Sequence, residues 1–192
     1  MTLRTPTLTR RRAGLALGGV IFALLVPATT LAATITGTNG NDRIEGTAQA
    51  DTIDALAGND IVNARGGNDV VHAGPGADRV TGAGGDDVIR GGGGPDLLNG
   101  GAGADRIGGG DGRDDVFGGP GGDRLRGGAN ADLLFGGGGQ DRILGDDGPD
   151  LIIVSGDRTR DVVDCGSGRD IVYAGPTDLV AANCERVVTR PY

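Results

Sequence analysis

Large aromatic side chains are almost missing from this chain of 192 residues. Aromatic residues make up 3% of it, and neither Trp nor Lys occurs. A globular core built around large rings is therefore not expected. With one His and two Cys, the chain also has few ligands for zinc or copper. Gly is abundant instead, with 41 residues against a usual share of about 7%.

The residues that nucleophilic catalysis requires are equally scarce. His72 is the single His, and the two serines, Ser155 and Ser167, have no plausible base beside them. Windows that match G-x-G-x-x-G follow from the Gly content, because no long strand precedes them and no helix follows. The sequence therefore predicts no enzyme and no dinucleotide site.

The first 33 residues differ in kind from the rest. Arg4 and residues 10–12, all Arg, precede an apolar run over residues 13–26, and small residues end the segment at Ala33. This layout predicts a signal peptide over residues 1–33 and a secreted, extracellular bacterial protein. An uncleaved anchor is the alternative, although the run is shorter than the roughly 20 residues that span a bilayer.

Removal of the leader would make the chain strongly acidic. It takes away four Arg and no acidic residue, so the net charge moves from −8 to −12. An acidic balance of this size argues against nucleic acid as a partner. We also expect no membrane span in the mature chain.

A nine-residue period organises residues 37–153. Thirteen nonads follow one another without insertion, with Asp in every sixth place and Ile, Val or Leu in every eighth. The fourth place is Gly except at Gln49 and Asn130. Collagen would need Gly at every third residue, and disorder would not need an aliphatic residue in phase. The period therefore predicts an all-β solenoid.

Each place in the nonad has a physical role. The Gly-rich half turns tightly, because Gly adopts positive φ without steric cost. Places seven to nine form a very short strand in which the eighth side chain points inward and its neighbours point outward. Two nonads make one coil, so the repeats give roughly 6.5 coils in a rod about 30 Å long.

Stacking such coils brings carboxylates together. An Asp recurs on one edge at every coil, about 4.8 Å from the next. Two charges at that distance repel by ~0.9 kcal/mol in water and ~3.5 kcal/mol at an effective dielectric of 20. A divalent cation between them would remove this repulsion, and calcium suits flexible sites of carboxylate and carbonyl oxygens.

Residues 37–153 resemble the repeats-in-toxin (RTX, haemolysin-type) calcium-binding repeat, G-G-x-G-x-D-x-U-x. The resemblance implies a parallel β-roll in which each Ca²⁺ lies between loops one coil apart, held by Asp side chains and loop carbonyls. It pairs Asp96 with Asp114, Asp105 with Asp123, Asp114 with Asp132, and Asp123 with Asp141. The implied metal ligands are Asp60, Asp69, Asp78, Asp87, Asp96, Asp105, Asp114, Asp123, Asp132, Asp141 and Asp150, with Asp42, Asp51, Asp161 and Asp170 as weaker members. Unlike toxins of the family, this chain is expected to be a roll without an effector domain.

Residues 154–192 are predicted to form a C-terminal cap of degenerate repeats. The phase slips by two residues after Ile153, and the Asp-x-aliphatic spacing then returns. Cys165 and Cys184 are separated by nearly one coil, which places them on adjacent coils, and an exported protein favours a disulfide between them. A redox or metal pair is the rival, but no CxxC spacing or neighbouring His supports it.

Odd and even nonads are expected to form opposite sheets with different outer surfaces. One sheet shows the apolar residues Leu97, Phe117, Leu133, Phe135, Leu151 and Ile153. The other shows Arg90, Arg106, Arg124, Arg126 and Arg142. The apolar surface predicts self-association or an envelope partner, unless the C-terminal cap covers it. The arginines suggest either contact with anionic glycans or protection of strand edges.

Together these features predict a secreted calcium-binding module, residues 34–153, that folds on binding extracellular calcium and has a structural or surface-interaction role. The alternative is a calcium-dependent adhesin or matrix component that binds envelope glycans or a protein. Ice binding is the weaker alternative, because it needs regular outward Thr rows and only Thr52 and Thr81 occupy such places.

Overall fold

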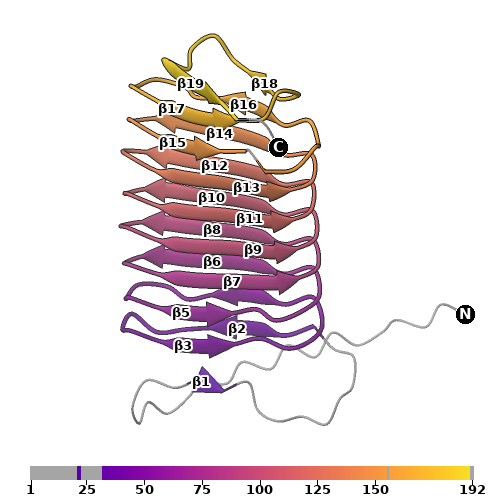
Figure 1. Cartoon of the computed structure of the whole chain (residues 1–192). Coiled ribbons are helices and arrows are strands. Elements are labelled where there is room, and N and C mark those ends of the chain that lie inside the picture. The colour runs from indigo at the N-terminus through magenta and orange to yellow at the C-terminus, as the bar shows by residue number, and fades with distance from the viewer. Residues whose placement is uncertain (1–20, 23–31, 155, 191–192) are drawn as a thin grey trace, which may run out of the picture.

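The computed structural model describes residues 21–22, 32–154 and 156–190, and these form a parallel β-solenoid of stacked coils (Figure 1). The described residues contain strands and turns but no helix. The all-β fold predicted from the nine-residue period is thereby confirmed. Most of the predicted signal peptide lies outside the described residues, and only residues 21–22 and 32–33 of it are described.

The coils build two parallel sheets that lie back to back. The ten-stranded sheet contains the odd-numbered strands, in the order β1 (Ile21–Phe22), β3 (Arg43–Glu45), β5 (Ile61–Asn63), β7 (Arg79–Gly84), β9 (Leu97–Ala102), β11 (Asp115–Pro120), β13 (Leu133–Gly138), β15 (Leu151–Ile153), β17 (Ile171–Ala174) and β19 (Arg186–Thr189). The nine-stranded sheet contains β2 (Thr34–Thr36), β4 (Thr52–Asp54), β6 (Val70–Pro75), β8 (Val88–Gly93), β10 (Arg106–Asp111), β12 (Arg124–Ala129), β14 (Arg142–Asp147), β16 (Val162–Asp164) and β18 (Leu179–Val180).

Strand register shows that two nonads make one coil. Val116 of β11 lies opposite Leu98 of β9 and Leu134 of β13, each 18 positions away in the sequence. The strands of the central coils are longer than the three residues expected, because they continue through the first three places of the following nonad. Gly110 and Asp111, for example, still pair with Gly92 and Gly93 of the preceding coil.

The core is a double row of aliphatic side chains from the eighth place of each nonad. Ile44, Leu98, Val116 and Leu134 are fully buried, and the neighbouring side chains point outward in the alternation typical of strands. Ala55, Ala64 and Ala73, in the first place of their nonads, are buried as well. The predicted inward direction of the eighth place is confirmed.

The C-terminal segment continues the stack with altered spacing. Ile152 pairs with Val172 at a distance of 20 positions, which is the predicted slip of two residues. Cys165 and Cys184 form a disulfide with a Cα–Cα distance of 5.3 Å, as predicted from their separation of nearly one coil. The disulfide ties the end of β16 to the segment that precedes β19.

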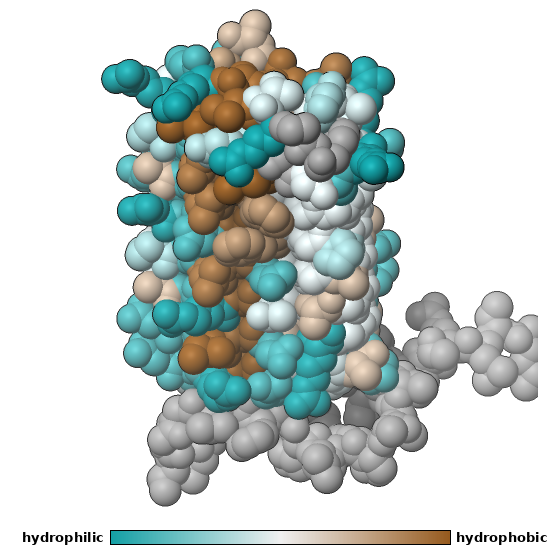
Figure 2. Space-filling view, in the orientation of Figure 1, coloured by the Kyte–Doolittle hydropathy of each residue, from teal (hydrophilic) through white to brown (hydrophobic). Residues whose placement is uncertain are grey.

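The two sheets present different surfaces, as the sequence predicts. Figure 2 shows a band of hydrophobic side chains along the face of the ten-stranded sheet. Leu97 and Phe135 are among its exposed residues, and the rings of Phe117 and Phe135 are 6.2 Å apart. Strands β17 and β19 extend the sheet at its end and do not fold back over this face (Figure 1). Of the two alternatives that the sequence left open for the apolar surface, the structure therefore has the exposed one. Within the described ranges, no helix is long and apolar enough to cross a membrane.

Candidate calcium site

The sixth-place aspartates form two ladders, one at each edge of the coils. Each carboxylate is buried, with no more than 6% of the residue exposed. From Asp60 in one ladder and Asp69 in the other onward, the Oδ1 atom accepts a hydrogen bond from the backbone N–H of the aspartate one coil earlier, as Asp114 does from Asp96 at 2.8 Å. The first ladder contains Asp42, Asp60, Asp78, Asp96, Asp114, Asp132, Asp150 and Asp170. The second ladder contains Asp51, Asp69, Asp87, Asp105, Asp123, Asp141 and Asp161.

All aspartates that the resemblance implies as ligands, the weaker ones included, therefore lie in these ladders. The pairs Asp96 with Asp114 and Asp105 with Asp123 are successive members of the first and the second ladder. The same holds for Asp123 with Asp141. The structure thus brings together the side chains that the period places one coil apart.

The second carboxylate oxygen of most ladder members has no protein partner. Among the described residues, thirteen buried Oδ2 atoms accept no hydrogen bond. They belong to Asp60, Asp69, Asp78, Asp87, Asp96, Asp105, Asp114, Asp123, Asp132, Asp141, Asp150, Asp161 and Asp170. A buried charged oxygen without a partner costs more than the ~1–3 kcal/mol typical of a neutral group. Because this cost recurs along the whole edge, a cation bound to these oxygens would stabilise the fold.

Backbone oxygens approach the same points. A Cβ atom built on Gly109 would collide with Asp114 Oδ2 and would lie 2.6 Å from the carbonyl oxygen of Gly127, one coil further on. The first-place glycines Gly82, Gly91 and Gly127 face a carboxylate and a carbonyl oxygen in the same way. The missing Cβ leaves a cradle that is lined by one carboxylate oxygen and one carbonyl oxygen.

The turns contribute a second set of oxygens. Gly76 has a φ of 156°, and a Cβ there would collide with the carbonyl oxygen of Gly58 and lie 3.2 Å from Asp78 Oδ1. Asn130, the non-Gly residue best suited to this place, has a φ of 85°, whereas Gln49 is not among the residues with positive φ. The turn of the second nonad therefore lacks the positive φ that most of the later nonads have at this place.

Asp42 and Asp51 differ from the rest of their ladders because a threonine donates hydrogen bonds to the Oδ2 atom of each. The Thr38 N–H and hydroxyl both donate to Asp42 Oδ2, the hydroxyl at 3.0 Å. Thr47 does the same for Asp51 Oδ2, at 2.6 and 3.0 Å. Sequence reasoning missed this role, although the signal was present as Thr in the second place of the first two nonads.

The far ends of the ladders are closed by acidic side chains of the cap. Asp161 N–H donates to Asp178 Oδ1 at 3.2 Å, and Asp170 N–H donates to Glu185 Oε2 at 2.8 Å. Gly175 N–H in turn donates to Asp178 Oδ2 at 2.7 Å. Glu185 lies outside the nonads, and nothing in the nine-residue pattern identifies it.

The electrostatics of the ladders favour a bound cation or a bound proton. The pKa of Asp96 is raised to about 7, mainly because the carboxylate is buried. The hydrogen bond from the Asp78 N–H lowers this pKa, and the charges of Asp78 and Asp114 raise it. Burial likewise raises the pKa of Asp150 and Asp161 to about 7. The pKa of Asp123 and Asp141 rises to about 6 for the same reason.

The donor set fits calcium. It consists of carboxylate and carbonyl oxygens, which are the ligands that Ca²⁺ takes in flexible geometry. No cluster of three or more His, Cys, Asp or Glu side chains suited to a metal occurs among the described residues. A cation in the ladders would thus depend on backbone oxygens as well as on carboxylates.

Comparison with protein families agrees with this chemistry. The model of the RTX calcium-binding nonapeptide repeat (4 copies) matches residues 36–71, 56–89, 64–98, 81–116 and 117–152. These matches cover residues 36–152 without a gap, which is more than half of the chain. Comparison with curated proteins finds no match. The chain belongs to the family of RTX calcium-binding nonapeptide repeat proteins, whose repeats bind Ca²⁺.

Proposed function

We propose that this protein is a secreted module whose two aspartate ladders bind Ca²⁺ between successive coils, and that this binding folds the chain after export. The observation that carries the proposal is the row of buried Oδ2 atoms without a partner. Bound calcium would supply the positive charge that offsets the repulsion within each ladder. Because the sites exist only in the stacked coils, the free energy of calcium binding is also free energy of folding.

The ladder members that would hold calcium are those with an unpartnered oxygen, from Asp60 to Asp170. Asp42 and Asp51 are left out, because Thr38 and Thr47 already satisfy their Oδ2 atoms. The glycines of the first place would supply room and the carbonyls of the turns would supply further oxygens.

Titration of residues 34–192 with calcium tests this proposal directly. Calorimetry would measure uptake while circular dichroism follows strand content in the same samples. We expect strand content to rise with calcium uptake and to fall again with a chelator. Magnesium at the same concentration serves as the control, since it demands a more rigid octahedral geometry. Equal strand content with calcium and with chelator would contradict the proposal.

Export of the protein rests on the leader-like residues 1–33 and on the chemistry of calcium. Extracellular modules typically bind calcium with Kd values of ~10⁻⁴–10⁻³ M, which suits an environment rich in the ion. Expression of the full chain in a bacterium, followed by mass measurement of the protein in the medium, tests the location. We expect a mature chain that begins near residue 34.

A surface-interaction role is favoured by the apolar band on the ten-stranded sheet. Leu97 and Phe135 are exposed there, and Phe117, Leu133, Leu151 and Ile153 surround them with partial exposure. Contiguous apolar surface of this kind marks contact with a second copy or with an envelope partner. Sedimentation of the Phe117→Ser/Phe135→Ser variant in calcium should show a loss of self-association. The Val162→Ser variant, which changes an exposed apolar residue of the nine-stranded sheet, is the matched control.

A further inference from the structure

We infer that the outer face of the nine-stranded sheet binds a linear anionic polysaccharide with one carboxylate on each sugar. The face is defined by Arg90, Arg106, Arg124, Arg126 and Arg142, and it is called the arginine face below. The inference rests on the proposed function in one respect, because the arginines are aligned only when the coils are stacked.

Three of these arginines form a straight row across adjacent strands. Arg106 of β10 lies directly opposite Arg124 of β12, which lies directly opposite Arg142 of β14. All three are exposed, and neighbouring strands are about 4.8 Å apart. Like charges directly opposite each other on a sheet are destabilising. An external anion would relieve this repulsion.

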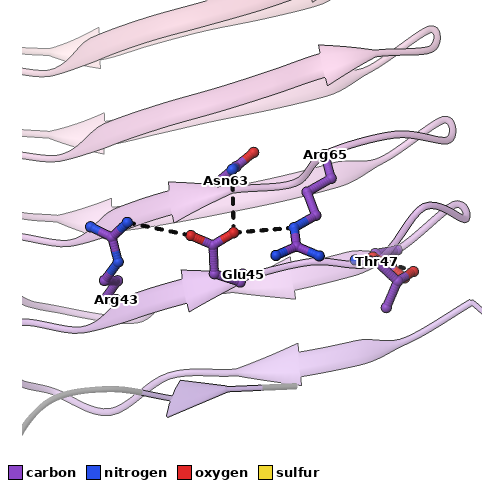
Figure 3. A network of polar contacts seen from close by, with 6 residues as sticks. Arg43, Glu45, Thr47, Asn63 and Arg65 are labelled. Carbon is purple, nitrogen blue, oxygen red and sulfur yellow. Dashed lines mark hydrogen bonds and ion pairs between the residues drawn. The ribbon is translucent and has the colours of Figure 1, made fainter. Parts of the chain in front are cut away.

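No carboxylate among the described residues forms a salt bridge with an arginine of this row. Among the described residues, only Arg43, Arg65 and Arg126 form salt bridges. Arg43 and Arg65 share Glu45 on the opposite sheet, as Figure 3 shows. The three arginines of the row thus have no salt-bridge partner among the described residues, although the protein as a whole is acidic.

Protection of strand edges does not explain the row. Strands β10, β12 and β14 are each hydrogen-bonded on both sides, to β8 and β12, to β10 and β14, and to β12 and β16. Edge protection is needed only where backbone groups are unpaired. The sequence left two interpretations of these arginines, protection of strand edges and contact with an anion. The structure argues against the first and is compatible with the second.

The second column of the arginine face leaves room for a ligand. Gly108 lies opposite Arg90 on one side and Arg126 on the other, and a Cβ built on Gly108 would meet no atom within 4 Å. Arg126 is held by Asp146 at 2.9 Å, and Arg90 lies 2.7 Å from the His72 ring. Two oriented guanidinium groups thus flank an open strip of backbone beside the row.

A polyuronate matches this arrangement. Guanidinium groups bind carboxylates in a bidentate geometry, and a chain lying along the axis of the solenoid would offer successive carboxylates to successive arginines. Nucleic acid fits less well, because base stacking needs aromatic side chains. The described aromatic side chains Phe117, Phe135 and Tyr173 all belong to strands of the opposite sheet.

Binding of a short oligogalacturonate to residues 34–192, measured by calorimetry in saturating calcium, tests the inference. We expect the Arg106→Gln/Arg124→Gln/Arg142→Gln variant to bind about tenfold more weakly or worse. The Arg79→Gln/Arg113→Gln/Arg186→Gln variant changes the net charge equally and removes exposed arginines away from the face. It should keep the affinity of the parent within about twofold, because long-range charge contributes little at physiological salt.

Equal losses in the two variants, or no binding by a parent that circular dichroism shows to be folded, would overturn the inference and leave the proposed function intact. Tighter binding of a single-stranded oligonucleotide of equal charge would overturn the assigned class of partner. Failure of the parent to fold in calcium would overturn both, since the arginine face would then not form.

Discussion

At the scale of single residues, the ladders divide the aspartates into two groups. Interior members such as Asp105 have one oxygen bound to a backbone N–H and one without a partner. Asp42 and Asp51, at the start, differ because a threonine donates hydrogen bonds to the Oδ2 atom of each. The same residue type in the same place of the repeat therefore has two different chemical roles, and the second place of the nonad decides which.

The Asp105→Asn substitution should separate these roles from one another. The amide oxygen can still accept the Asp87 N–H, but the charge that attracts calcium is lost. We expect the calcium concentration at the folding midpoint to rise about tenfold, since carboxylate number sets affinity in oxygen-ligand sites. The matched Asp42→Asn variant should leave the midpoint almost unchanged. Equal shifts in the two variants, measured by circular dichroism, would contradict the assignment.

Gly93 and Gly94 offer a similar contrast within one turn. Gly94 has a φ of 108° and faces the carbonyl oxygen of Gly76, whereas a Cβ on Gly93 would meet no atom within 4 Å. Gly94→Ala should lower the free energy of unfolding by about 1–3 kcal/mol because of backbone strain. Gly93→Ala should change it by no more than about 0.5 kcal/mol. Denaturant unfolding in saturating calcium measures both, and a large loss in Gly93→Ala would count against the stated cause.

At the scale of elements, each ladder behaves as a coupled titrating unit. In the metal-free protein the pKa of Asp96, Asp150 and Asp161 is about 7, above the usual value of 3.8. The folded state therefore binds protons more tightly than the unfolded state. The stability that protonation gives is fully present below about pH 4, and it is lost as the pH rises towards about 7.

Metal-free protein should accordingly have its highest strand content near pH 4 and lose it as the pH is raised to about 8. With saturating calcium the trend should reverse, because protons compete with the metal for the same carboxylates. Thermal unfolding followed by circular dichroism, with and without chelator, checks both signs. If folding in the presence of chelator did not depend on pH, the ladder carboxylates would not be buried in the metal-free fold.

The disulfide acts on the C-terminal elements. It closes a loop of 19 residues between the end of β16 and the start of β19. The Cys165→Ser/Cys184→Ser variant should lose about 3 kcal/mol of stability in the cap. Limited proteolysis in calcium should then cut after residue 165 faster than in the parent, while the central coils resist. Cleavage at the same rate in the two proteins would show that the hydrogen bonds of the cap suffice.

The elements that sequence could predict are those that the nine-residue period governs. A side chain's place in the nonad predicts the eighth-place core and the pairing of residues 18 apart. It also predicts that Phe135 and Arg124 are exposed on opposite sheets. The period could not predict the length of β6 to β14, because glycines of the first three places stay in the ladder of backbone hydrogen bonds. Nor could it predict Glu185, whose role depends on the fold of a segment without repeats.

At the scale of the whole molecule, each coil contacts only the coils beside it. Stability in such a protein is a sum of terms within coils and between neighbouring coils, so folding can begin at one end and propagate. The two ends differ in what they need. The first two turns are completed by Thr38 and Thr47, and the last coils by a disulfide and acidic side chains. Under the proposed function, the coils that need the metal are those whose aspartates have an unpartnered oxygen, from Asp60 to Asp170.

The difference between the two ends also limits how copies of the protein can associate. One terminus offers turns already saturated by hydroxyl groups, and the other offers carboxylates already engaged by amides. Placed head to tail, two copies would not extend either row of metal sites across the junction. The rod therefore has a fixed length, and raising the calcium concentration should not join rods end to end into filaments.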